Sequence, residues 1–243
     1  NIYNNKFDCR DRTEVIAEIF YIISNALAAQ NNYILSNFYL NLAKYLNPDF
    51  VSYRTLQAEN FFLIQEYEKA KEIYTEIKKK GTIYNWHASK QITSILKRQN
   101  KNKEALNNLK KSFEKIANPR IYEIFDYAEF LKDNEKYKES IEYYSKVLSL
   151  IDTKNVLFAQ VVDGRGIAYE RTDQWDKAEV DLLNSLSASP DDAYVINYLA
   201  YSWIEQGINI KQSLISENLM LINFIPWYDY TIVGIFRIII CTN

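Results

Sequence analysis

The 243-residue sequence contains few of the residues that form tight turns, disulfides or metal sites: 5 Gly, 4 Pro, 2 Cys and 1 His. So little Gly and Pro argues against a turn-rich β protein and favours helices joined by short connections. Cys9 and Cys241 lie at opposite ends of the chain, so we do not expect a structural disulfide. No set of metal-ligating residues lies near His87, and we expect it on the surface of a helix.

Charge of one sign is also missing. The chain has 29 basic and 31 acidic residues, a net charge of −2 and no block of either sign. A nucleic-acid-binding domain normally carries a basic stripe, so we do not expect a nucleic-acid partner. Hydrophobic residues make up 48% and charged residues 25%, which is typical of a folded protein and excludes a disordered chain.

Motifs of known catalytic sites are missing as well. The sequence has no glycine-rich phosphate loop, no nucleophile elbow and no paired metal-binding histidines. The short segment Gly164–Gly166 resembles a loop, but it falls inside an expected helix, where Gly166 fills a position that requires a small residue. We therefore expect a protein that is not an enzyme and that binds no cofactor or metal ion.

What the sequence does contain is a repeat. Small residues recur at intervals of 34, 35, 35, 38 and 35, at Ser36, Ala70, Ala105, Ser140, Ala178 and Ser213. A period of about 34 residues is typical of a tetratricopeptide array, in which each repeat is a pair of antiparallel helices. The small residue is needed where the second helix crosses the first, because the two backbones approach closely there.

Other positions agree with this repeat. When the small residue is placed at position 20, position 8 is also small, and positions 4, 7, 11 and 24 are mostly large and apolar. These residues form facing stripes on the two helices of a pair. Polar residues stand at three stripe positions, namely Arg54, Gln57 and Arg165.

The sequence therefore predicts an all-α fold, a right-handed α-solenoid of tetratricopeptide helix-turn-helix repeats. A lead-in at residues 1–12 precedes an array at 13–215, and an apolar tail follows at 216–243. The expected units are 17–49, 51–83, 86–119, 121–154, 159–191 and a partial unit at 193–215.

Residues 219–241 (LMLINFIPWYDYTIVGIFRIIIC) are apolar without the repeat pattern. A membrane segment is one interpretation, but Pro226, Asp229 and Arg237 interrupt the ~20 apolar residues that a span needs. A second interpretation is a capping helix on the sixth unit. The third, which we favour, is a non-native sequence produced by a reading-frame slip.

Two stretches of the chain, Asn41–Phe50 and Asp163–Ile210, have a more specific pattern. The second contains Arg-Gly, Tyr-Glu-Arg and Trp-Asp-Lys-Ala, followed by Asn-Tyr-Leu-Ala-Tyr. Over roughly residues 13–215 the chain resembles a family of long alphaproteobacterial tetratricopeptide-repeat proteins. The resemblance implies that the chain is a fragment, because the family's next repeat is replaced here by the apolar tail. Family members are often exported, which implies the bacterial periplasm or envelope rather than the cytoplasm.

In such an array, side chains of the first helices face a concave groove. We predict that the partner contacts Lys90, Tyr122, Phe125, Asp163, Arg171, Asn197, Tyr198 and Tyr201. The charges between Asp163 and Arg171 have two interpretations, structural ion pairing between units, which we favour, and contact with a ligand. The carboxylate clamp of co-chaperone repeats is not expected, because Ser94 replaces the asparagine that would accompany Lys90.

The predicted function is a non-enzymatic scaffold that binds a peptide or a partner protein in this groove. The alternative is a structural segment of a longer envelope protein with no ligand of its own. The identity of the protein partner does not follow from the sequence. Contact with a membrane is expected only through residues 219–241.

Overall fold

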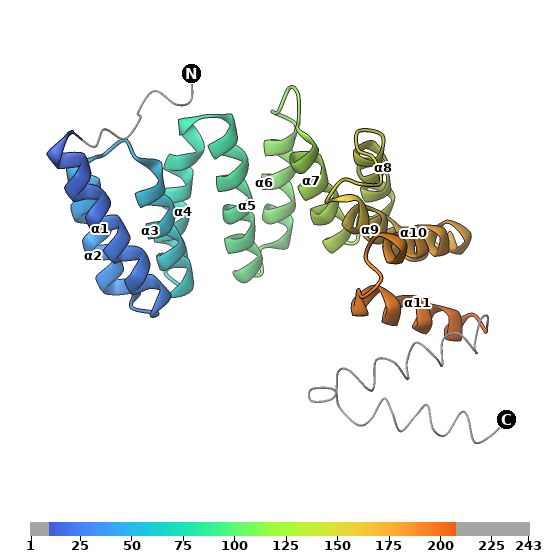
Figure 1. Cartoon of the computed structure of the whole chain (residues 1–243). Coiled ribbons are helices and arrows are strands. Elements are labelled where there is room, and N and C mark those ends of the chain that lie inside the picture. Colours follow the sequence, from blue (N-terminus) through green and yellow to red (C-terminus); the bar gives the residue numbers. More distant parts are fainter. Residues whose placement is uncertain (1–9, 208–243) are drawn as a thin grey trace. The chain divides into compact units, whose positions relative to one another are not determined.

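In a computed structural model, residues 10–207 are described, and this part of the chain contains helices and no strands (Figure 1). The helices are α1 (Arg12–Ala29), α2 (Tyr33–Leu46), α3 (Val51–Leu63), α4 (Tyr67–Ile77), the short 3-10 helix η1 (Lys78–Lys80), α5 (Thr82–Arg98), α6 (Asn102–Phe113), α7 (Ile121–Asp133), α8 (Tyr137–Leu148), α9 (Phe158–Glu170), α10 (Trp175–Ala188) and α11 (Ala193–Glu205). The all-α prediction is therefore confirmed for these residues.

The chain divides into two compact units, with the boundary between Glu123 and Ile124 in the first turn of α7. In unit 1 each helix packs against the next one in the sequence, from α1 to α6. In unit 2 the same holds for α8, α9, α10 and α11. Helix α7 meets α8 through Tyr127 and Tyr143, whose ring centroids lie 4.9 Å apart.

The turn inside each helix pair has one recurring form. Five residues have a positive φ of 58–64°, namely Asn31, Gln65, Asn100, Glu135 and Asp173. In each turn the next N–H bonds to a carbonyl five residues earlier, as from Asn32 to Leu27 at 2.9 Å. This is the Schellman motif, which satisfies the free carbonyls at the end of a helix. The left-handed residues recur with the spacing of the small residues, so the repeat is present in the backbone.

The small residues lie where the sequence pattern predicts. Ser36, Ala70, Ala105, Ser140 and Ala178 are all fully buried. In the first pair the Ser36 hydroxyl donates a hydrogen bond of 2.9 Å to the carbonyl of Ser24, which occupies position 8. Close approach of the two backbones therefore explains the size limit at these positions.

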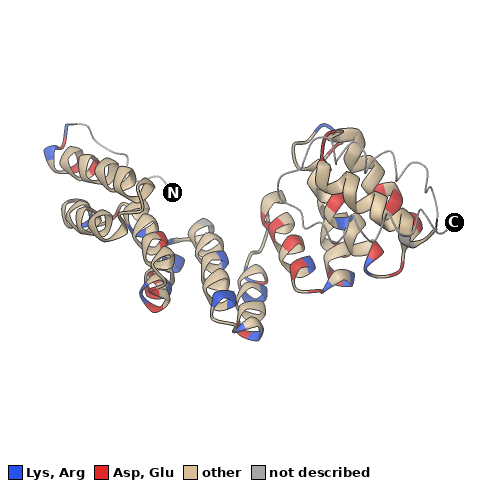
Figure 2. Ribbon diagram, turned by 90° about the horizontal axis from the view of Figure 1, so that it is seen from below, with Lys and Arg blue, Asp and Glu red and all other residues tan. Residues whose placement is uncertain are grey.

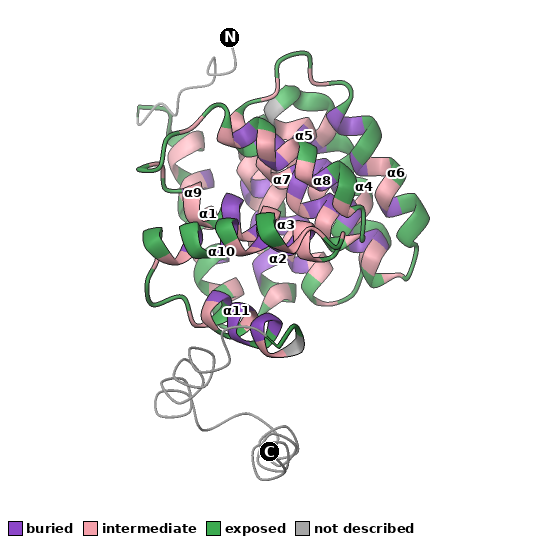
Figure 3. Ribbon diagram, turned by 90° about the vertical axis from the view of Figure 1, so that its right-hand side faces the viewer, coloured by how far each residue is buried: buried purple, intermediate pink, exposed green. Residues whose placement is uncertain are grey.

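Buried side chains lie along the faces that the helices turn toward one another (Figure 3). In unit 1 one cluster is centred on Leu40 and Tyr53, and another on Tyr74 and Ile95. In unit 2 a cluster of Leu182, Val195, Leu199 and Trp203 joins α10 to α11. Several local cores replace one central core, as expected of a repeat array.

The polar residues at stripe positions are hydrogen-bonded between helices. In unit 1 the Gln57 amide donates to Asn41 at 2.8 Å and accepts from Arg54 at 2.7 Å. In unit 2 Arg165 forms two hydrogen bonds to the Asp181 carboxylate, at 2.7 and 2.9 Å. These residues fit the repeat because each network reaches a neighbouring helix.

The expectation for His87 was wrong. Its ring is half-buried on α5, 6.2 Å from the Tyr74 ring, and its Nε2 atom is buried without a hydrogen-bond partner. Burial, and secondarily the charge of Lys90, lowers its pKa.

Several sequence predictions fall on residues outside the described range. These are Cys9, Cys241, the small residue Ser213 and the apolar tail 216–243. The three interpretations of the tail therefore stay open.

Candidate partner-binding face

Six of the eight predicted contact residues belong to unit 2. Phe125 lies on α7, Asp163 on α9, Arg171 directly after α9, and Asn197, Tyr198 and Tyr201 on α11. The other two, Lys90 on α5 and Tyr122 at the start of α7, belong to unit 1. We call the surface formed by α7, α9 and α11 from Ile124 onward the first-helix face of unit 2.

Asp163 is the least satisfied polar residue on this face. Its Oδ1 atom is buried and has no hydrogen-bond partner. Burial raises the pKa of the carboxyl to about 6, and the negative charges of Asp192 and Glu129 add to the rise while Lys132 opposes it. This oxygen thus lacks a donor, although the residue as a whole is half-buried.

Glu129 of α7 is held beside this carboxylate. The Tyr144 hydroxyl from α8 donates a hydrogen bond to Glu129, and Lys132 lies 3.1 Å from the other Glu129 oxygen. Burial and the charge of Glu129 raise the pKa of Tyr144, so its hydroxyl stays a donor.

Gly164 lets α9 approach these groups. A Cβ atom at this position would lie 2.5 Å from the Tyr144 hydroxyl oxygen and 2.8 Å from a Glu129 oxygen. Any side chain would therefore overlap the Tyr144–Glu129 hydrogen bond. Gly164 is the residue through which the backbone of α9 reaches α7 and α8.

A second cluster joins α9 to α11. The Tyr198 hydroxyl donates a hydrogen bond of 2.7 Å to Glu170, and Arg171 Nε lies 3.4 Å from the same carboxylate oxygen. Burial first, and then this hydrogen bond, raises the pKa of Tyr198. Tyr198 and Arg171, both predicted as contact residues, are brought together by Glu170.

Exposed aromatic rings flank this cluster. Tyr194 and Tyr201 on α11 are 60% and 51% exposed, and Asn197 between them is also exposed. The Tyr194 and Tyr198 rings lie 6.1 Å apart. Phe125, half-buried on α7, lies 6.3 Å from the Tyr144 ring. The face thus presents aromatic surface next to hydrogen-bonding groups.

The unit 1 residues lie in different surroundings. Tyr122 is 61% exposed, and Lys90 is half-buried close enough to His87 to lower the pKa of that imidazole. Because both residues belong to the other unit, the first-helix face of unit 2 is defined without them.

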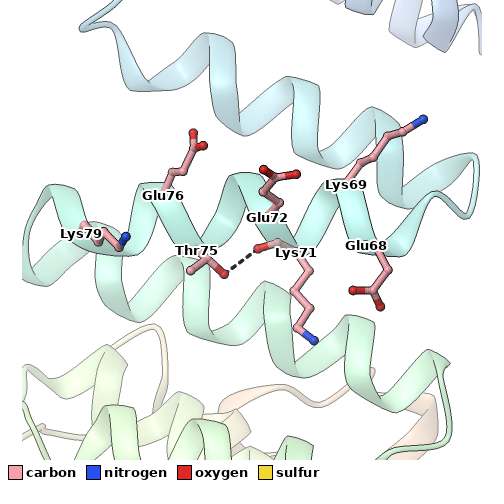
Figure 4. Close-up of a pocket in the computed structure, with 7 residues that line it drawn as sticks. All are labelled: Glu68, Lys69, Lys71, Glu72, Thr75, Glu76 and Lys79. Carbon is pink, nitrogen blue, oxygen red and sulfur yellow. Dashed lines mark hydrogen bonds between the residues drawn. The ribbon is translucent and has the colours of Figure 1, made fainter.

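Figure 2 shows both basic and acidic residues on the helices of each unit. A shallow depression in unit 1 is lined by seven residues of α4 and η1, which point outward from the helix as charged or hydroxyl side chains (Figure 4). Because only α4 and the η1 turn that continues it line this depression, it is a solvated helix surface and does not enclose a ligand. Within residues 10–207 no group of three metal-ligating side chains occurs, and no helix is long and apolar enough to cross a bilayer.

Comparison with known proteins places the fold. The sequence matches no protein-family model and no curated protein. Among solved structures, it aligns with a tetratricopeptide repeat protein from Parabacteroides merdae over 87% of this chain and 81% of that chain, with a TM-score of 0.65 and 14% identity. PilW, described as a widely conserved type IV pilus biogenesis factor, aligns over 90% of this chain and 98% of that chain, with a TM-score of 0.66 and 13% identity.

The chain has the tetratricopeptide-repeat fold. A chain of the APC/C hetero-tetramer Cut9–Hcn1 shares it, with a TM-score of 0.52 and 17% identity over 88% of this chain and 45% of that chain. Identities this low show the fold alone. The predicted solenoid class is confirmed, and the resemblance to the alphaproteobacterial family stays a prediction.

Within the tetratricopeptide pattern, several residues of the site were missed, among them Lys132, Tyr144 and Tyr194. Lys132 holds position 12 of its repeat, on the first helix, so the repeat numbering could have found it. Tyr144 holds position 24, which is a core position. Its ring is buried as predicted, but its hydroxyl reaches Glu129. No signal in the repeat pattern indicates this.

Proposed function

We propose that the chain is a non-enzymatic scaffold that binds a peptide or a partner protein on the first-helix face of unit 2. The observation that carries the proposal is Asp163, whose Oδ1 atom is buried without a donor on the face that also carries the exposed Tyr194 and Tyr201. An unpaired buried carboxylate costs stability, and a partner that supplies a donor removes that cost.

The face favours a partner with two features. One is an N–H donor, from a lysine, an arginine or a backbone amide, that reaches Asp163 where Glu129 adds negative charge. The other is apolar surface that covers Tyr194 and Tyr201. Tyrosines on rigid helices provide contact area at a low entropic cost, because few torsions are lost on binding.

Site-specific photo-crosslinking in the source cells tests the proposal. A photoreactive phenylalanine analogue replaces Tyr201 in one variant and Val180, an exposed residue of α10, in a matched control. We expect one discrete protein adduct from position 201, weakened by a second substitution, Asp163→Asn, and no such adduct from position 180. Equal adducts from both positions, or none from 201, would contradict the proposal.

A second candidate function, a structural segment that packs against further protein, is favoured by a different observation. Helices α1 and α2 expose large apolar side chains, including Ile22 at 61% and Phe38 at 55%. The same crosslinker at Ile22 and Phe38 tests this candidate. Adducts with a different protein from these positions, together with none from Tyr201, would favour it over the scaffold, whereas an adduct with a second copy of this chain would not.

A further inference from the structure

The first helix pair has an unusual outer surface. Exposed large apolar side chains concentrate on α1 and α2, at Ile16, Ile19, Ile22, Ile34, Leu35, Phe38 and Tyr45. Apolar surface gathered in one place on a folded protein generally marks an interface. Its place in the repeat shows what kind of interface.

The exposed face of α1 corresponds to a face that is covered in every later repeat. Counted from the start of each repeat, position 3 is Ile19 in the first repeat, where the side chain is 49% exposed. In the five later repeats the residue at this position is at most 5% exposed; these residues are Tyr53, Ala88, Glu123, Val161 and Val195. Position 10 behaves alike: Ala26 is exposed, whereas Asn60, Ile95, Phe130, Ala168 and Ser202 are buried.

Within each unit of the molecule, positions 3 and 10 are buried in the later repeats because the second helix of the preceding repeat packs against them. In unit 1, α2 packs on α3 and α4 on α5, while in unit 2, α8 packs on α9 and α10 on α11. The face of α1 is therefore the continuation of an established helix-to-helix interface. Its chemistry calls for another α-helix.

The outer face of α2 is apolar where other second helices are polar. Positions 18, 19, 22 and 29 are Ile34, Leu35, Phe38 and Tyr45 in α2. In α4 and η1 they are Glu68, Lys69, Glu72 and Lys79, the charged residues of Figure 4. Of the twelve residues at these positions in the next three repeats, only Val180 is apolar. Ring contacts run from Phe38 through Tyr39 to Phe20, so the apolar surface of α2 adjoins α1.

We propose that the helix that covers α1 is α1 of a second copy, in an antiparallel dimer centred on Ile19. The apolar stripe Ile16, Ile19, Ile22 is symmetric about Ile19. An antiparallel copy therefore places Ile16 against Ile22 and Ile19 against itself. A self-complementary patch of this kind is what a two-fold interface requires.

Charge and area agree with this occupant. Residues 12–46 contain two basic residues, Arg12 and Lys44, and two acidic ones, Glu14 and Glu18. In the antiparallel pairing Arg12 lies opposite Ala26 and Glu14 opposite Ser24, so neither faces a like charge, while the two Glu18 side chains flank the axis residue. A standard interface buries about 800 Å² per partner, so the exposed apolar side chains of α2 have to contribute to it beside those of α1.

Charge exchange at the symmetry axis tests the dimer with the full chain. Sedimentation velocity between about 1 and 100 µM should show a dimer of the wild-type protein. Because residue 19 faces its own copy, Ile19→Glu and Ile19→Lys should each raise the dimer Kd about 100-fold or more through like-charge repulsion. An equimolar mixture of the two variants should restore the dimer.

Val180→Glu, which changes an exposed apolar residue of unit 2, should leave the dimer Kd within about twofold of wild type. Hydrogen exchange of α3–α6 in both Ile19 variants checks that unit 1 remains folded. The proposal is overturned by a wild-type protein that stays monomeric at 100 µM, or by a dimer that survives Ile19→Glu. It is also overturned if the two charged variants, each monomeric, fail to associate when mixed, because residue 19 would then not face its own copy.

Discussion

Units 1 and 2 place different chemistry at the same repeat position. In unit 1, at position 7 of the second repeat, Gln57 hydrogen-bonds through its neutral amide to Asn41, which is exposed. In unit 2, at position 7 of the fifth repeat, Arg165 forms an ion pair with Asp181, whose side chain is 5% exposed. Both residues satisfy the repeat, but only the second pair buries charge.

The difference extends to the neighbouring first helices. In unit 1, buried polar contacts such as Asn60 to Ser36 and Asn37 join neutral groups. In unit 2, Glu129, Asp163 and Glu170 bring carboxylates to the first-helix face, and Asp163 lacks a donor. A neutral hydrogen-bond network loses little stability when one partner is missing, whereas a buried charge lowers stability strongly unless it is fully paired.

Replacing the position 7 residues, Gln57 in unit 1 and Arg165 in unit 2, should give the largest difference in stability between the two units. Arg165→Met leaves the Asp181 carboxylate buried and unpaired, and should lower the free energy of unfolding of unit 2 by about 3 kcal/mol or more. Gln57→Met removes the partner of the exposed Asn41 amide and one acceptor of Arg54, which keeps Glu76, and should cost about 1 kcal/mol. Denaturant titrations of both variants measure the difference.

As a control, Arg165→Met combined with Asp181→Leu should recover most of the loss, because the orphaned charge is gone. Equal losses from the two single variants would show that the charge of the Arg165 network is unimportant.

Two glycines of α9 provide a smaller contrast inside unit 2. Gly164→Ala should cost about 2 kcal/mol, because the new methyl group overlaps the Tyr144 hydroxyl and Glu129. At Gly166 the closest atom is a side-chain carbon of Leu182 at 3.0 Å. Leu182 is buried, but alanine favours helix and offsets part of the overlap, so Gly166→Ala should cost less than Gly164→Ala, about 1 kcal/mol. Thermal melting followed by circular dichroism compares them, and a larger loss at Gly166 would contradict the placement of Tyr144.

The smallest effect should be the same in both units. Gln65 and Glu135 adopt a left-handed conformation in equivalent turns, with φ of 64° and 59°. Replacing either with glycine removes that strain and should raise the free energy of unfolding by about 0.5–1 kcal/mol. Similar gains by denaturant titration would show that the turns are equivalent. A gain in one unit alone would show that they are not.

The sequence predicted the parts of the fold that depend on local spacing. The small residues and the stripe positions recur within each repeat, so the spacing alone sufficed to place Ser36 or Ala178. The partners of Arg54, Gln57 and Arg165 could not be placed, because they depend on how the side chains of adjacent helices align. Asp181, for example, lies 16 residues after Arg165 on the next helix.

The candidate site was predicted in the same partial way. The repeat numbering placed Asp163, Tyr198 and Tyr201 on first helices. It did not reveal that Tyr144 crosses from the second helix, or that Glu170 bridges Tyr198 and Arg171. His87 was misplaced because a single polar residue in a helical pattern carries no information on whether a neighbouring ring covers it.

Ionisation should affect the two units in opposite directions. In unit 1 burial lowers the pKa of His87, so the folded state binds fewer protons and stability is lost as the pH falls below about 6.5. In unit 2 burial raises the pKa of Asp163 from 3.8 to about 6, so the folded state binds more protons. Stability is therefore lost as the pH rises from about 4 to 6, by up to about 3 kcal/mol.

The most direct test of an unsatisfied carboxylate on the first-helix face compares wild type with Asp163→Asn across this range. The free energies of unfolding, measured by denaturant titration at about pH 3.5, 5 and 7, should be nearly equal at the lowest pH. At about pH 7 the Asn variant should be more stable by about 1–3 kcal/mol, because it cannot ionise. A gap that does not change with pH, or a variant that is less stable at neutral pH, would show that Asp163 already has a partner and would contradict the proposed binding face.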